Sequence, residues 1–197
     1  MLAMDMPNLL GQLFIVGLPR PMLDEETRKF LTTFCPGGVI LFHHNAPDPQ
    51  TLLTLCQELH ALPSPPLIAI DHEGGRVQRL DLPFTRFPTA MRLGATGSPF
   101  LAGRVGGAMA KELRAVGIDL NFAPVLDVLT NPDNPVIGDR AFSSRPDTVA
   151  RIGGALMLGL QKGGVIPCGK HFPGHGHTDA DSHATLPCVD KTFDDLM

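Results

Sequence analysis

The stretch GGVILFHHNAPDPQTLLTLCQELHALPSPPLIAID (residues 37–71) decides the fold. Its first six residues are apolar and β-branched and follow a proline, which predicts a buried strand. Residues 48–62 then place leucines at helical spacing, and residues 67–70 (LIAI) predict a second buried strand that ends at Asp71. A strand, a helix and a strand in this order predict a parallel βαβ unit.

The same alternation extends in both directions along the chain. Continuously apolar strands indicate a parallel sheet that is covered on both faces. We count about five βα units, which predicts an α/β fold of the (β/α)8 TIM-barrel type, incomplete because such a barrel takes ~250 residues. A doubly wound open sheet is the structural alternative, although its G-x-G-x-x-G fingerprint is missing. The other expected strands are residues 13–18, 121–128 and 165–169, and the other expected helices are residues 24–34, 99–116, 146–162 and a helix that starts at 192–197.

Composition narrows the class of protein. The 197 residues have a net charge of −4, with 43% hydrophobic and 18% charged residues, which is typical of a globular domain. The acidic balance disfavours nucleic acid as a partner, and we find neither a membrane span nor a signal peptide. The four cysteines follow no metal or redox spacing, so we expect buried thiols in a cytoplasmic protein.

Charged side chains gather where the predicted strands end. Asp71 follows the third strand, Asp127 closes the fourth, Arg140 comes soon after it, and Lys170 with His171 follows the fifth. Because ligands bind at the carboxyl ends of parallel strands, we expect these side chains to converge on one site.

The segment GKHFPGHGHTDADSH (residues 169–183) is rich in histidine and aspartate and allows two chemical interpretations. The cluster His175, His177 and Asp179 has ligand types that suit zinc, which would make the protein a metal-dependent hydrolase. Asp181 and His183 instead form an acid/base pair, because a carboxylate two residues from an imidazole can orient the ring and raise its basicity. A polar surface loop is the third possibility.

Four motifs in this order resemble those of family 3 glycoside hydrolases. They are IAIDHEGGRVQRL (residues 68–80), NFAPVLDV (residues 121–128), VIGDRAFS (residues 136–143) and the histidine-rich segment. The form KHFPGHG followed by DSH is similar to the bacterial β-N-acetylglucosaminidases of cell-wall recycling. The resemblance spans nearly the whole chain and implies a (β/α)8-type barrel, of which residues 1–197 would be the N-terminal part.

That resemblance also implies an activity and a set of residues. It implies retaining hydrolysis of terminal, non-reducing β-linked N-acetylglucosamine from peptidoglycan-derived muropeptides, with no metal and no cofactor. His183 would be the general acid/base and Asp181 its partner. The residues implied to bind the sugar are Asp71, Arg79, Arg140, Lys170 and His171.

Two departures from the family pattern lead to further expectations. His72 stands where the family usually has Gln, which should alter local hydrogen bonds and leave the sugar contacts in place. A retaining glycosidase needs a nucleophile, and we expect that Asp in a segment beyond Met197. The chain would then be a fragment of the enzyme, or else a truncated and inactive sugar-binding remnant. The oligomeric state is not predicted.

Overall fold

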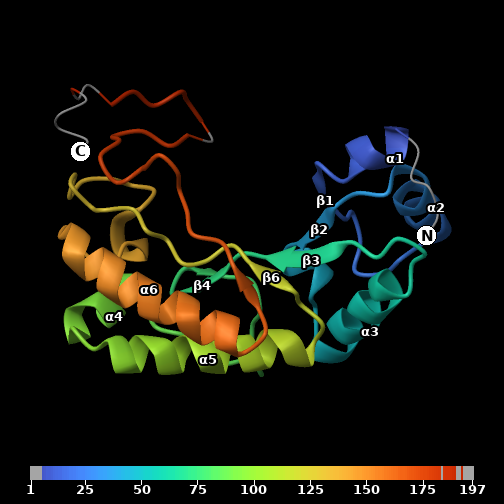
Figure 1. The fold of residues 1–197 in the computed structure, drawn as a ribbon, viewed down its shortest axis with the longest axis horizontal. Coiled ribbons are helices and arrows are strands. Elements are labelled where there is room, and N and C mark those ends of the chain that lie inside the picture. The colour runs from blue at the N-terminus through green and yellow to red at the C-terminus, as the bar shows by residue number, and fades with distance from the viewer. Residues whose placement is uncertain (1–5, 183, 190–191, 193–197) are drawn as a thin grey trace.

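The protein is represented by a computed structural model, and the structure describes residues 6–182, 184–189 and 192. Its main sheet has five parallel strands in the order β1-β2-β3-β6-β7 (Figure 1). These strands are Ile15–Gly17, Gly38–Leu41, Leu67–Ile70, Leu120–Asn121 and Ile166–Pro167. Each strand pairs with the strand of this sheet that comes before it in the chain, so the strands follow one another across the sheet in sequence order. A doubly wound sheet would instead reverse this order at one point. The predicted α/β fold with barrel-type strand order is therefore confirmed, and the open-sheet alternative was wrong.

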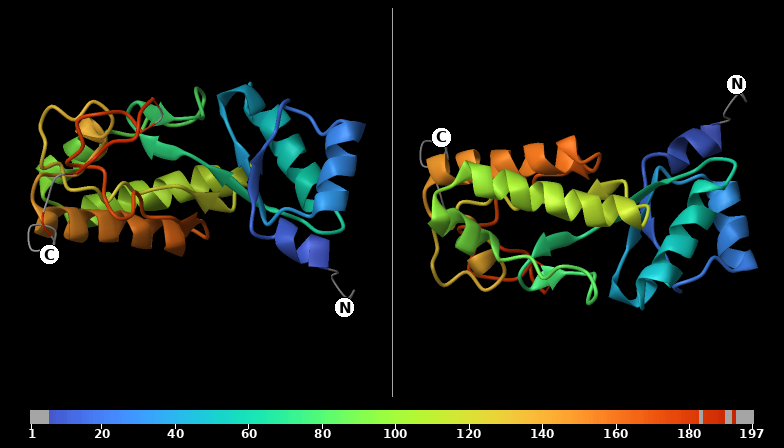
Figure 2. Two further views of the ribbon diagram at one scale, coloured as in Figure 1. Left: turned by 90° about the horizontal axis from the view of Figure 1, so that it is seen from above. Right: turned by 90° about the horizontal axis from the view of Figure 1, so that it is seen from below.

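The described part of the chain also contains six α-helices and two short 3-10 helices. The α-helices are α1 (Met6–Gly11), α2 (Glu25–Phe34), α3 (Pro49–His60), α4 (Ala90–Thr96), α5 (Pro99–Ala115) and α6 (Pro146–Lys162). The 3-10 helices are η1 (His43–Asn45) and η2 (Gly138–Arg140), and a small antiparallel hairpin consists of β4 (His72–Gly74) and β5 (Val77–Gln78). Figure 2 shows that α2 and α3 lie at one end of the molecule and α4 to α6 at the other.

Short polar side chains fix where the helices begin. Asp24 accepts a hydrogen bond from the Thr27 backbone N–H at the start of α2, and Asp48 does the same with Thr51 at the start of α3. Such caps satisfy N–H groups that the helix itself leaves unpaired.

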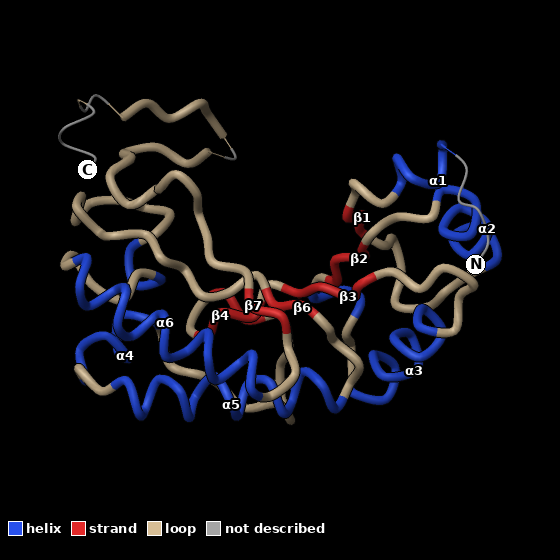
Figure 3. Tube along the Cα trace, viewed as in Figure 1, coloured by secondary structure: helices blue, strands red, loops and turns tan. Residues whose placement is uncertain are grey.

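One continuous core joins the sheet to its helices. Val39 and Leu41 of β2 and Ile68 and Ile70 of β3 are fully buried in that core. Alternate residues of a strand face opposite sides, so Ile40 of β2 faces away from them and is only half-buried. Figure 3 shows the strands as a band, with α5 on one side and the loops after β6 and β7 on the other.

Helices α5 and α6 pack at very short range because glycines line their contact. A Cβ built on Gly106 would lie 2.3 Å from the Leu156 carbonyl oxygen, and one on Gly159 would lie 2.3 Å from the Gly103 carbonyl oxygen. These glycines therefore allow the two backbones to touch, which fixes the position of the segment between the helices.

Several expected elements differ from the structure. The strand expected at residues 121–128 ends at Asn121 because Pro124 cannot donate a ladder hydrogen bond, and the chain rejoins the sheet only through a bridge from Val125 to Lys170. The first strand is three residues long rather than six. Helix α4 and the β4–β5 hairpin were not predicted. The helix expected from residue 192 lies outside the described residues except for Thr192, which is not helical.

The expectation for the cysteines was only half right. Cys35 and Cys56 are buried free thiols, whereas Cys168 is half-buried and Cys188 is exposed. Burial raises the pKa of Cys56 to about 12, with a smaller contribution from the charge of Asp119, so this thiol stays protonated at neutral pH. Within the described ranges, no helix is long and apolar enough to cross a membrane.

Candidate active site

Four charged side chains meet where the strands end. Asp71 directly follows β3, Glu73 lies in β4, Lys170 follows β7 and Arg140 ends η2. The Lys170 Nζ lies 2.6 Å from Asp71 Oδ1 and 2.6 Å from Glu73 Oε1. Arg140 forms a bidentate pair with Glu73, with N–O distances of 2.8 and 2.9 Å. Residues up to 99 positions apart in the sequence therefore form one ionic network.

His171 joins this network to a second carboxylate. Its Nδ1 lies 2.6 Å from Asp127 Oδ2, and its Nε2 lies 3.5 Å from an Arg140 side-chain nitrogen. The side chain of His171 is 35% exposed, whereas that of Asp127 is fully buried. His171 can therefore meet a ligand, and Asp127 can act only through its neighbours.

The buried charges of the site are held in their ionised forms. Burial alone would raise the pKa of Asp127, but hydrogen bonds from the His171 side chain and the His175 backbone hold it below its usual value. Burial alone would lower the pKa of Arg140, and the hydrogen bonds and charge of Glu73 raise it above its usual value. The site thus contains fixed opposite charges, which suits a ligand with many hydroxyl groups.

Buried amides secure the start of the histidine-rich segment. Asn134 donates to the carbonyl oxygens of His175 and Thr178, at 2.7 and 2.8 Å, and accepts from the backbone N–H groups of Val136 and Ile137. The segment is therefore tied to the loop that leads into η2.

The expected zinc-type cluster is not assembled. The Nδ1 of His175 lies 2.6 Å from the Thr178 hydroxyl, and that of His177 lies 2.9 Å from the Thr130 hydroxyl. Asp179 is exposed. Among the described residues, no three His, Cys, Asp or Glu side chains come together as metal ligands. The geometry therefore does not favour the metal-dependent hydrolase.

The structure brings together four of the five residues expected to bind the sugar, namely Asp71, Arg140, Lys170 and His171. The fifth, Arg79, follows β5 and is half-buried, and its Nε is buried without a hydrogen-bond partner in the part of the chain that the structure describes. Of the expected acid/base pair, Asp181 is exposed and its carbonyl accepts from the Ala184 and Thr185 N–H groups. His183 lies outside the described residues.

Sequence reasoning assigned no role in the site to Glu73, and it placed Asp127 among the converging strand-end side chains without giving it a role. Both lie close to the end of a predicted strand, because Glu73 comes three residues after the end of β3 and Asp127 lies near the end of the NFAPVLDV run. The contacts that reveal them join residues 67 and 44 positions apart, and no local pattern shows such contacts.

His72 lies between two site residues and points away from them. Neighbouring residues of an extended segment face opposite sides, and the His72 side chain is buried edge-on against the Phe87 ring. Its backbone pairs with the Asn121 side chain in both directions. Burial lowers the pKa of His72 to about 4, so the ring is neutral near pH 7.

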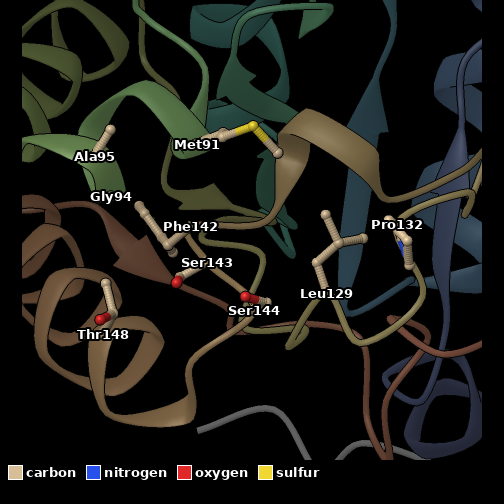
Figure 4. A pocket seen from close by; sticks show the side chains of 9 residues that line it. All are labelled: Met91, Gly94, Ala95, Leu129, Pro132, Phe142, Ser143, Ser144 and Thr148. Atoms are coloured by element: carbon tan, nitrogen blue, oxygen red, sulfur yellow. The ribbon is translucent and has the colours of Figure 1, made fainter.

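A separate hollow lies near α4, the start of α6 and the loop after β6 (Figure 4). No charged side chain lines this hollow, so its chemistry is unlike that of the ionic network. Its lining residues are Met91, Gly94, Ala95, Leu129, Pro132, Phe142, Ser143, Ser144 and Thr148.

The chain is similar in sequence and in fold to known glycoside hydrolases. A β-hexosaminidase of Thiobacillus denitrificans is 46% identical over 194 residues, which are 95% of this chain and 54% of that protein. A family 3 β-N-acetylglucosaminidase from Paenibacillus has a TM-score of 0.95 at 40% identity over 98% of this chain and 38% of its own. NagZ from Neisseria gonorrhoeae, solved with N-trifluoroacetyl-D-glucosamine, has a TM-score of 0.88 at 43% identity over 92% of this chain and 56% of its own.

The chain spans about half the length of the curated relatives that it matches. Residues 6–197 match the family described as the glycosyl hydrolase family 3 N terminal domain. The chain therefore belongs to glycosyl hydrolase family 3.

Proposed function

We propose that this chain forms the sugar-binding part of a β-N-acetylhexosaminidase. The enzyme hydrolyses terminal, non-reducing β-linked N-acetylglucosamine, and its natural substrates are peptidoglycan-derived muropeptides in the cytoplasm. The observation that carries the proposal is the network of Asp71, Glu73, Lys170, Arg140 and His171 at the strand ends. The relatives named as β-hexosaminidases and the related NagZ solved with an N-acylated glucosamine support it.

The exposure of the side chains supports a different part in binding for each. Asp71, Lys170 and His171 are partly exposed, at 20%, 16% and 35%. A carboxylate accepts hydrogen bonds from sugar hydroxyls, and an ammonium group donates them. Glu73 is only 5% exposed, so it holds Lys170 and Arg140 in place and does not itself contact the sugar.

The proposed reaction retains the configuration of the sugar. An Asp expected beyond Met197 attacks the anomeric carbon while His183, with Asp181 as its partner, protonates the leaving group, and water activated by His183 then releases the sugar from that Asp. An imidazole can give and take a proton near neutral pH, which both halves of a double displacement require. The anchoring of His175 and Thr178 supports this assignment, because it fixes the segment that leads to Asp181.

Hydrolysis of an aryl β-N-acetylglucosaminide by the purified full-length enzyme that contains this chain tests the proposal. We expect the wild-type enzyme to keep its turnover in the presence of a chelator. His183→Ala should lower turnover by about 100-fold or more, and Asp71→Ala should weaken substrate binding. Asp133→Asn is the matched control, because Asp133 is an exposed carboxylate of the loop before η2. Sugar binding without turnover would leave only a sugar-binding remnant, and turnover that a chelator abolishes would contradict the proposed mechanism.

A further inference from the structure

Asp127 contacts two parts of the site at once. Its Oδ2 accepts from the His171 Nδ1 at 2.6 Å and from the His171 backbone N–H at 3.3 Å. Its Oδ1 accepts from the His175 backbone N–H at 2.5 Å. We propose that Asp127 is a positioning residue that couples the orientation of the His171 ring to the place of the histidine-rich segment; this inference rests on the proposed function.

The two partners of the His171 ring define its tautomer. Ionised Asp127 has only acceptor oxygens, so the ring nitrogen facing it, Nδ1, bears the proton. The other nitrogen, Nε2, faces Arg140, which has only donors, at 3.5 Å. His171 therefore presents a lone pair at Nε2, and a sugar hydroxyl can donate to it.

The segment after His171 is held against the same part of the chain. Gly176 lies so close to Val128 that a Cβ on it would be 1.9 Å from the Val128 carbonyl oxygen. The Gly176 carbonyl accepts from the Asn131 backbone N–H at 3.1 Å. Asp127 is thus the first of several residues that anchor this segment, and it also contacts His171, which we propose to bind the sugar.

An amide of the same shape cannot replace this carboxylate. Asp127→Asn places an acceptor oxygen on one side and an NH2 donor on the other. If the oxygen faces His171, the NH2 opposes the His175 N–H. If the NH2 faces His171, the Nδ1 must lose its proton, and the protonated Nε2 then opposes Arg140. Either orientation disrupts one half of the coupling.

Nitrogen-15 NMR of the histidine rings tests the tautomer without any turnover. We expect the wild-type His171 ring to be protonated at Nδ1 only, with its signals assigned by their loss in His171→Gln. In Asp127→Asn we expect either the Nε2-protonated tautomer or a shifted backbone amide of His175. A wild-type ring protonated at Nε2 only would overturn the inference even if Asp127→Asn fails to fold.

Kinetics on the aryl β-N-acetylglucosaminide provide the second measurement. At metal sites, removing a group that orients a ligating histidine costs about 10- to 100-fold in affinity or activity. By analogy we expect kcat/KM of Asp127→Asn to fall by about 10-fold or more, while that of Asp133→Asn matches the wild type. A folded Asp127→Asn protein with wild-type kcat/KM would overturn the inference. So would lost activity with unchanged His171 and His175 signals. Absence of wild-type turnover would contradict the proposed function and leave the NMR test of Asp127 standing.

Discussion

Replacement of His72 by Gln should make the protein more resistant to acid. Burial against Phe87 lowers the pKa of His72 in the folded protein from 6.5 to about 4. Unfolded chains therefore bind a proton on this ring near pH 6.5, whereas the folded protein does not until about pH 4. Stability is lost as the pH falls through this window, because the unfolded state binds more protons.

The size of the effect follows from the width of that window. About 2.5 pH units at about 1.36 kcal/mol each give a loss of at most about 3.4 kcal/mol from this residue. Gln has no proton to gain. As the pH falls below 6.5, the unfolding free energy of His72→Gln should therefore decrease less than that of the wild type. This difference should stop growing below about pH 4.

Urea unfolding followed by far-UV circular dichroism at several pH values between 7.5 and 4 measures this difference. Circular dichroism is the suitable signal because the chain has no Trp and no Tyr. His43→Gln removes an imidazole that is 68% exposed and is the control, expected to follow the wild type. Parallel profiles for His72→Gln and the wild type would refute the reasoning.

Two further predictions concern packing and buried charge. Gly159→Ala should destabilise the protein by about 1–3 kcal/mol in thermal melts, because its Cβ would overlap the Gly103 carbonyl. Gly154→Ala in the same helix is the control. Its Cβ would meet no atom within 4 Å, so this change should be neutral or stabilising. Glu73→Ala should cost about 3 kcal/mol, because it leaves the largely buried Arg140 without its carboxylate partner and leaves Lys170 with Asp71 alone. Glu58→Ala removes only a surface pair and should cost less than about 1 kcal/mol in urea unfolding. Equal losses within either pair of variants would contradict these assignments.

The strands and helices that the sequence predicts best are those with strong local signals. Strand β3 has the predicted bounds because its apolar run ends abruptly at Asp71. Helices α2 and α3 begin after aspartates that cap them. In these segments the hydrophobic pattern and the capping residues agree, so local information is sufficient.

Elements set by backbone irregularities were harder to predict. Gly74 and Gly75 adopt φ values of 95° and 60°, which turn the chain within the β4–β5 hairpin. A glycine pair after a strand is equally typical of a loop, so the hairpin was missed. Strand β6 was overestimated because the apolar run continues past Pro124, although the ladder does not.

The site was predicted where charged residues directly follow strands, and missed where only long-range contacts reveal a role. Asp71, Lys170 and His171 were identified in this way, and the structure joins them with Arg140 as the strand-end rule predicts. Glu73 stands one residue beyond His72, and only its ion pair with Arg140 shows that it belongs to the network.

Direct binding of N-acetylglucosamine, measured by calorimetry, tests the central claim that the strand-end network is a sugar site. Saturable binding by the wild type and by Asp133→Asn, with loss of binding in Asp71→Ala, is the predicted result. A wild-type protein that binds no sugar, or an Asp71→Ala variant that binds it with wild-type affinity, would contradict the claim.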